Sequence, residues 1–255
     1  MKLTFIGCGS AASKEGYQTN ALLEFADGKR MLLDCGTTAA FGMRDLGLGY
    51  PDVDAIWISH LHSDHCGGLE EQGFCRFFDP RFGPQRLFIS RALKTPLWSN
   101  TLSGGMRSLQ GRICDLDTYF DVQTDNKFGV FHYNGVDFQN IQVVHIFDNF
   151  AIYPSFGLMF ETPEGIKVFY TADTQDNPKQ MMDWYKQADV IFHDCETLIK
   201  IESGVHAHYD RLKALPDEIK ARMHLMHYQD GTIEFYDPEA DGFAGFVKKG
   251  ETFEL

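Results

Sequence analysis

Four residues capable of binding a metal ion fall within one stretch of six, and they are His60, His62, Asp64 and His65. They directly follow the apolar run 53–58, which predicts a buried strand. Side chains two residues apart on an extended segment point to the same side, so His60 and His62 can converge on one ion. Asp64 and His65 come at the turn into a predicted helix and can reach a second ion. Imidazole and carboxylate ligands favour zinc, with manganese or iron(II) as competitors, and we prefer this interpretation to a run of surface histidines.

Three more polar residues each close an apolar run that predicts a strand, and they are His145, Asp173 and His227. At the end of a strand, a loop can present such a side chain to a shared cleft. One residue of this kind alone would be interpreted as structural. Three of them, added to the first motif, predict ligands that come together from distant parts of the chain.

Length and composition are those of an ordinary soluble globular protein, with 255 residues, 44% hydrophobic and 23% charged. No linker divides the chain, which predicts a single domain over residues 1–255. No apolar run approaches the ~20 residues that span a bilayer, so no membrane association is expected. Residues 1–7 predict a strand rather than a signal peptide. The six cysteines are scattered without a CxxC pair, which predicts reduced thiols in a cytoplasmic protein.

A net charge of −13 argues against a broad nucleic-acid-binding surface, because neutralising phosphates dominates such affinity. Residues 76–112 depart from this balance: seven basic residues against one acid give a local charge of +6, with aromatic residues interleaved. Two interpretations stay open. The segment forms an anion-binding wall beside the metal site, or its arginines pair with acids elsewhere on the surface.

Strands and turns alternate along both halves of the chain, and Asp27-Gly28 and Asn134-Gly135 each predict a tight hairpin. Predicted strands cover residues 3–9, 19–26, 29–34, 54–59, 86–90, 127–133, 136–145, 156–162, 167–171, 189–193 and 224–228, and predicted helices cover 67–73, 178–187 and 206–215. Strands followed by helices in two successive halves predict two sheets packed face to face with helices outside, an αββα sandwich. The Gly-rich, polar stretch 98–126 is interpreted as an irregular insertion that serves as a lid or a dimer contact.

The order of these motifs resembles the metallo-β-lactamase superfamily. The resemblance covers nearly the whole chain, through Phe5-Ile6-Gly7-Cys8-Gly9-Ser10, Leu33-Asp34-Cys35-Gly36, the motif at 60–65, His145, Thr171-Ala172-Asp173-Thr174 and His227. It implies the metallo-β-lactamase fold, which is an αββα sandwich, with two divalent metal ions. The most favoured ion is Zn²⁺, and Mn²⁺ or Fe²⁺ are alternatives.

The ligand set that this resemblance implies divides into two groups. His60, His62 and His145 would hold one ion, Asp64, His65 and His227 would hold the other, and Asp173 would bridge the two ions. Asp34 resembles the aspartate that orients a ligand imidazole in this superfamily by accepting its second N–H. The alternative for Asp34 is a turn residue before Gly36.

After the bridging Asp173, the chain is most similar to the tRNase Z branch and its phosphodiesterase relatives, which are hydrolases rather than true β-lactamases. This similarity implies three catalytic residues, Asp64, Asp194 and His206. His206 would donate a proton from the head of a helix, and Asp194 would orient its ring. His208 is the alternative donor, because the catalytic-loop sequence departs from that of tRNase Z.

The function implied by the resemblance is metal-dependent hydrolysis of a small phosphodiester. Two ions that share a water lower its pKa, so that the resulting hydroxide can attack phosphorus. The chain is similar to compact phage and bacterial members of this branch, the anti-Pycsar-type phosphodiesterases, which degrade cyclic nucleotide signals. The expected substrate is therefore a small anionic nucleotide, and a homodimer is expected. The alternatives are a tRNA 3′-end endonuclease, a lactone, thioester or phosphonate ester hydrolase, and a non-enzymatic scaffold.

Overall fold

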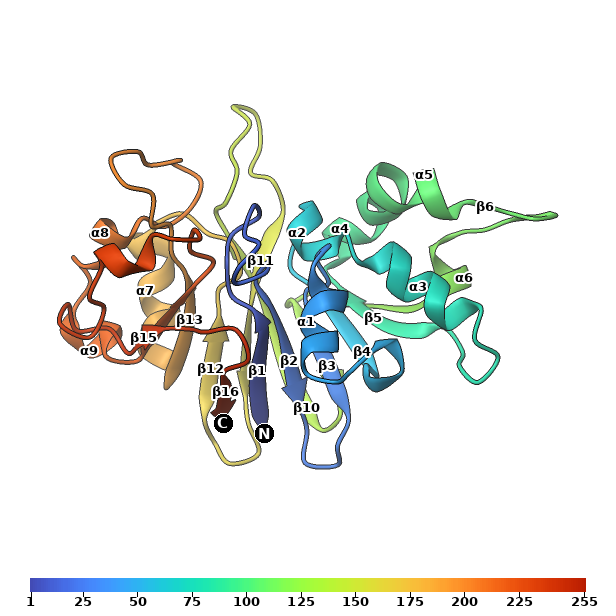
Figure 1. Cartoon of the computed structure of the whole chain (residues 1–255), viewed down its shortest axis with the longest axis horizontal. Helices are drawn as coiled ribbons and strands as arrows, with labels where there is room; N and C mark the ends of the chain where they lie inside the picture. The colour runs from blue at the N-terminus through green and yellow to red at the C-terminus, as the bar shows by residue number, and fades with distance from the viewer.

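Two seven-stranded β-sheets lie face to face at the centre of the computed structural model, which describes residues 1–255 (Figure 1). The first sheet contains, in spatial order, β16 (Thr252–Glu254), β1 (Lys2–Gly7), β2 (Asn20–Glu24), β3 (Arg30–Leu33), β4 (Ala55–Ile58), β5 (Gln85–Ile89) and β8 (Phe120–Thr124). The second contains β15 (Gly245–Phe246), β14 (Met223–Met226), β13 (Val190–Asp194), β12 (Lys167–Tyr170), β11 (Ser155–Glu161), β10 (Val136–Val143) and β9 (Val130–Tyr133).

Helices cover the outer face of each sheet (Figure 1). Beside the first sheet lie α1 (Ala39–Asp45), α2 (Ser63–Cys66), α3 (Leu69–Phe77), α4 (Arg91–Pro96), α5 (Ser103–Met106), α6 (Leu116–Tyr119), a 3-10 turn (Tyr50–Asp52) and a π-helix (Leu97–Leu102). Beside the second lie α7 (Pro178–Gln187), α8 (Tyr209–Leu212), α9 (Asp217–Lys220) and a 3-10 turn (Ile233–Phe235). The predicted αββα sandwich is therefore confirmed. No helix is long and apolar enough to cross a bilayer.

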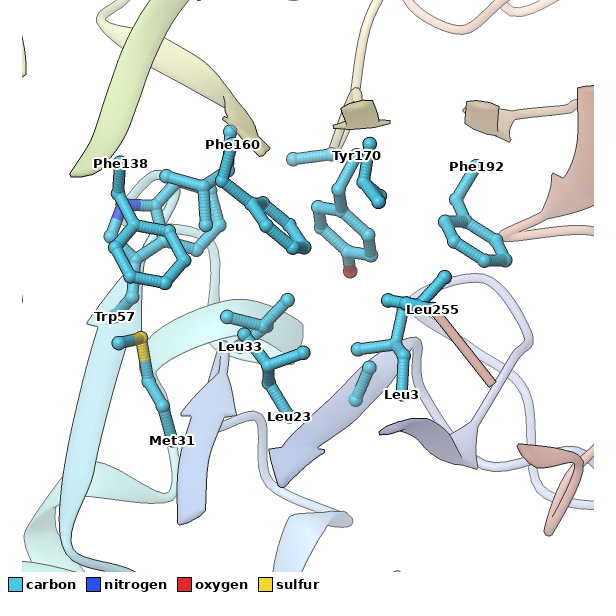
Figure 2. Packing of buried hydrophobic residues seen from close by; sticks show 14 of the residues in the cluster. Leu3, Leu23, Met31, Leu33, Trp57, Phe138, Phe160, Tyr170, Phe192 and Leu255 are labelled. Atoms are coloured by element: carbon cyan, nitrogen blue, oxygen red, sulfur yellow. The ribbon is translucent and has the colours of Figure 1, made fainter. Parts of the chain in front are cut away.

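The alternation of side chains along each strand explains why the sheets are buried on both faces. Leu23 and Leu33 point into the core between the sheets, while their neighbours Leu22 and Leu32 point toward the helices. Figure 2 shows Leu23 and Leu33 opposite Tyr170 in the layer between the two sheets. A strand with both faces buried carries a continuous apolar run, which is the pattern seen in the sequence.

Both sheets combine an antiparallel half with a parallel half, and this places the ends of many strands at one edge. In the first sheet β3, β4, β5 and β8 run parallel, and in the second β12, β13, β14 and β15 do so. The carboxyl ends of parallel strands meet at the same edge of a sheet, which is where open α/β sheets bind ligands. His60, Asp173 and His227 all follow such ends.

Two expectations about local structure were wrong, and two strands were missed. Segment 98–126 is not irregular: it holds the π-helix, α5, a hairpin of β6 (Ser108–Leu109) and β7 (Arg112–Ile113), α6 and the sheet strand β8. It folds because Leu102, Met106 and Tyr119 are buried against the first sheet. Within the region predicted as a helix at 206–215, only α8 is helical, so His206 lies in the loop before this helix. Strands β15 and β16 were not predicted.

Candidate metal centre

The histidine cluster begins where β4 ends. His60 is fully buried, and the chain then turns so that His62 is the residue before α2 and Asp64 and His65 lie on its single turn. Gly36 packs against this turn so closely that a Cβ there would lie 1.9 Å from the carbonyl oxygen of Asp64. A side chain at position 36 would therefore displace the helix that carries Asp64 and His65.

Three of the imidazoles are held through Nδ1, so that Nε2 faces the other candidate ligands. Nδ1 of His65 bonds to Oδ2 of Asp34 at 2.7 Å, and Nδ1 of His145 bonds to the carbonyl oxygen of Val205 at 2.8 Å. Nδ1 of His60 lies 3.0 Å from Oγ of Ser59. When Nδ1–H donates these bonds, the lone pair on each Nε2 points away from its partner and is available to a metal ion.

The first group of candidate ligands consists of His60, His62, His145 and Asp173, with all ligand atoms within 4.8 Å of one another. Nδ1 of His62 lies 3.0 Å from Nε2 of His60 and 3.2 Å from Nε2 of His145. Oδ2 of Asp173 lies 3.7 Å from both Nε2 atoms. Three imidazole nitrogens and one carboxylate oxygen thus face a common point.

The second group consists of Asp64, His65, Asp173 and His227. Nε2 of His65 lies 3.2 Å from Oδ2 of Asp64 and 3.2 Å from Oδ1 of Asp173. Nε2 of His227 lies 3.3 and 3.5 Å from the same two oxygens. These separations match the edge of about 3.3 Å expected for a tetrahedron of ligands roughly 2.0 Å from zinc. Asp173 therefore presents Oδ2 to the first group and Oδ1 to the second.

Charge also favours cations at this centre. The four carboxylates Asp34, Asp64, Asp173 and Asp194 are each at most 4% exposed, and four negative charges require compensation. Nε2 of His65 is buried without a hydrogen-bond partner. Burial lowers the pKa of His60, which favours the neutral imidazole that binds metals. Two divalent cations would supply four positive charges, so the residues present fit a dinuclear site.

Backbone strain is concentrated at the same place. Asp34, Ala172 and His227 adopt the left-handed region, with φ of 61°, 50° and 65°. For residues other than glycine this conformation costs on the order of 1–3 kcal/mol each, and it is enriched at functional sites. Ala172 directly precedes Asp173, so the strained peptide aims the shared carboxylate.

A histidine–aspartate pair adjoins the two ligand groups. Nδ1 of His206 forms a hydrogen bond with Oδ2 of Asp194 at 2.7 Å. The centroid of the His206 ring lies 4.8 Å from the ring centroid of His227 and 4.9 Å from that of His145. Burial alone would lower the pKa of His206, but the carboxylates of Asp194 and Asp173 together raise it above its ordinary value. His208 instead precedes α8 and bonds through Nε2 to the carbonyl oxygen of Leu198 at 2.9 Å.

Comparison with known proteins identifies the family. The family model described as Anti-Pycsar protein Apyc1 matches residues 1–253. The chain is 33% identical to the Anti-Pycsar protein Apyc1 of Bacillus phage 010DV004, over 100% of this chain and 98% of that protein. The chain belongs to the Anti-Pycsar Apyc1 family. It is also 35% identical to the member from Paenibacillus harenae, over 92% of each protein.

Solved structures show that this member of the Apyc1 family has the metallo-β-lactamase fold, as predicted. The structure of a diphosphatase from the PhnP family matches 100% of this chain and 97% of its own, with a TM-score of 0.75 and 17% identity. At this identity, the likeness shows the fold.

Two residues beside the centre of this Apyc1 family member were not anticipated. Ser59 links Asp34 to His60, because its N–H and Oγ both lie 2.8 Å from oxygens of Asp34. Tyr153 stacks on the His62 ring with centroids 5.5 Å apart and planes at 11°. Ser59 could have been found from its position in the sequence, directly between the predicted strand and the first histidine of the motif. Tyr153 carries no signal, since only folding brings it to His62.

The basic segment 76–112 does not form a continuous anion-binding wall. Four of its seven basic residues pair with nearby acids instead: Arg81 with Asp79, Arg86 with Asp121, Arg91 with Asp125 and Lys94 with Asp117. Arg76 donates to the carbonyl oxygen of Val53. The interpretation as arginines paired with acids is therefore the one that the structure supports.

Replacing Asp34 with asparagine is expected to weaken metal binding about 10- to 100-fold, the usual cost of losing a partner that orients a ligand. Asparagine tolerates the left-handed backbone at this position, so the fold should persist. Its amide can no longer serve as the charged acceptor for Nδ1 of His65. Competition with a chelating dye measures the affinity, and Asp183→Ala on the exposed face of α7 is the control. Unchanged affinity would contradict the role of Asp34.

Proposed function

We propose that this chain is a metal-dependent phosphodiesterase that hydrolyses a small phosphodiester, most favourably a cyclic nucleotide. The observation that carries the proposal is that Asp173 faces both ligand groups while the Asp194–His206 pair adjoins them. Two divalent ions bound there would polarise a phosphoryl oxygen and lower the pKa of a shared water toward neutrality. The imidazole-rich ligand set favours Zn²⁺ over Mn²⁺ and Fe²⁺.

The residues of the chain have separate roles in this proposal. His60, His62 and His145 would hold one ion, Asp64, His65 and His227 would hold the other, and Asp173 would be available to both. The charge that develops on a departing sugar oxygen requires a proton. His206 donates it from Nε2, because its Nδ1–H is already held by Asp194. Both ring nitrogens of His208 face backbone groups, which favours His206 over His208.

A small substrate fits the charge of the molecule better than a long polyanion. The net charge of −13 opposes binding of tRNA, and most basic residues of 76–112 are already paired. The name Anti-Pycsar protein, which the relatives carry, supports a nucleotide signal as the substrate.

A substrate panel tests this function. Purified protein is incubated with 3′,5′-cyclic nucleotides, precursor tRNA, an acyl lactone, a thioester and a phosphonate ester. Cyclic nucleotides are expected to give the highest kcat/KM. Asp173→Ala protein, prepared in the same way, controls for contaminating enzymes. Exclusive turnover of the lactone, or of precursor tRNA, would overturn the proposal.

We also propose that the protein acts as a cytoplasmic homodimer. All six cysteines are free and five of them are buried, which fits a reducing environment. The hairpin formed by β6 and β7 extends away from the body of the molecule and leaves Ile113 76% exposed (Figure 1). Light scattering should give twice the mass of one chain for the wild-type protein, and the mass of a single chain for Ile113→Asp. A wild-type monomer would contradict the proposal.

A further inference from the structure

Two loops with apolar tips rise at the same edge of the sheets, and each contacts a candidate ligand of the metal centre. They are residues 146–153, drawn in yellow-green in Figure 1, and residues 197–205, drawn in orange. Five of the twelve large hydrophobic side chains that are exposed in the whole chain lie on these loops, and they are Phe147, Phe150, Ile152, Ile199 and Ile201. Phe150 is the most exposed of them, at 94%. Such a concentration of exposed apolar side chains is typical of a binding surface.

The loop at 146–153 is a built hairpin. Phe147 pairs with Ile152, and the N–H of Tyr153 donates to the carbonyl oxygen of Ile146 at 2.8 Å. At the tip, Oδ1 of Asp148 accepts from the N–H groups of Phe150 and Ala151 at 2.9 and 2.8 Å. These bonds fix the turn that carries Phe150 outward, so the exposure of its ring is a property of the fold.

Both loops are tied to the candidate ligands. The hairpin directly follows His145, and it ends at Tyr153, which stacks on His62. In the second loop, the carbonyl oxygen of Val205 bonds to His145, and the carboxylate of Glu196 accepts from the N–H of Ser203 at 2.9 Å. Because they contact His62 and His145, the two loops border the place where the phosphate of a substrate would lie.

We propose that these loops bind the base of the nucleotide substrate, with Phe150 stacking on its flat face; this inference rests on the proposed function. The metal centre is buried and polar, so it suits the phosphate and leaves the base outside. A base is flat and aromatic, and stacking on an aromatic side chain is the recognition mode that tolerates different bases. Phe147 and Ile152 form the base of the hairpin, and Ile199 and Ile201 are the exposed apolar side chains of the second loop.

The test compares substrates with and without a base. Phe150→Ala is assayed with 3′,5′-cyclic AMP, 3′,5′-cyclic CMP and the base-free 3′,5′-cyclic phosphate of 1-deoxyribose. Loss of one stacking contact is expected to raise KM for both nucleotides about tenfold, with kcat within about twofold. KM for the base-free phosphate should not change. Phe150→Trp should restore the wild-type KM for the nucleotides.

Phe78→Ala is the matched control, because Phe78 is 66% exposed at the end of α3, outside both loops. An equal change in KM for all three substrates, or no change for any, would overturn the role of Phe150 while leaving the proposed function intact. A drop in mass by light scattering without a base-dependent KM would assign Phe150 to a contact between two copies and also overturn it. If wild-type protein hydrolyses none of the three substrates, the proposed function fails, and the inference fails with it.

Discussion

Asp173→Ala protein is expected to lose both metal ions and nearly all activity. Asp173 presents Oδ1 to one ligand group and Oδ2 to the other, so this single change removes a ligand from both. Losing a residue that only orients a ligand lowers metal affinity or activity by about 10- to 100-fold. Losing a shared ligand affects both ion sites, so activity should fall by at least roughly 10²- to 10⁴-fold. The measurements are ion content by mass spectrometry and kcat/KM for the best cyclic nucleotide.

Asp183→Ala is the control for this experiment, because Asp183 is an exposed aspartate on α7. It should keep its ions and its activity. A full ion content in the Asp173→Ala protein would show that the carboxylate does not bridge the two groups.

His206→Gln protein is expected to keep its metal ions but to lose about 10²- to 10⁴-fold in kcat for a cyclic nucleotide, the usual contribution of a general acid. Bis-p-nitrophenyl phosphate should be affected much less, because p-nitrophenolate departs without a proton. His132→Gln replaces an exposed histidine on β9 and should leave both rates unchanged. If His206→Gln removes metal instead, His206 is a ligand and its assigned role is wrong.

The pH profile provides a second readout of the same role. The acid form of His206 is the active one, so kcat should fall as pH rises through its pKa. Burial acts to lower that pKa, but the neighbouring carboxylates together raise it, and Asp173 contributes less to this rise than the negative charge of Asp194. Asp194→Asn removes this charge, so the alkaline limb of the profile should move to lower pH. A limb that stays in place, or moves to higher pH, would contradict proton donation by His206 with Asp194 as its partner.

The positions of the candidate ligands could be predicted because each one closes an apolar run. His145, Asp173 and His227 follow β10, β12 and β14, and parallel or alternately directed strands bring such ends to one edge. The hairpin between β9 and β10 could be predicted because the pair Asn134-Gly135 favours a tight turn with positive φ at both residues. The structure shows positive φ at both.

Other parts of the fold had no local signal. Strand β16 has only three residues and pairs with β1 from the opposite end of the chain, so its pattern was too short to recognise. The segment 98–126 contains Gly104 and Gly105, which suggested a loop. Gly105 nevertheless lies on α5, packed against the carboxylate of Glu70, a contact that only tertiary structure creates. The proximity of Tyr153 to His62 likewise depends on how the two sheets pack.

The central claim is that two cations share Asp173 between two groups of ligands, and the most direct test is to locate and count metal ions in the protein. Crystals of protein purified without chelators should show two anomalous-scattering peaks, one between His60, His62 and His145 and one between Asp64, His65 and His227. Elemental analysis should give about two ions per chain. Fewer than one ion per chain, or ions bound away from Asp173, would contradict the account.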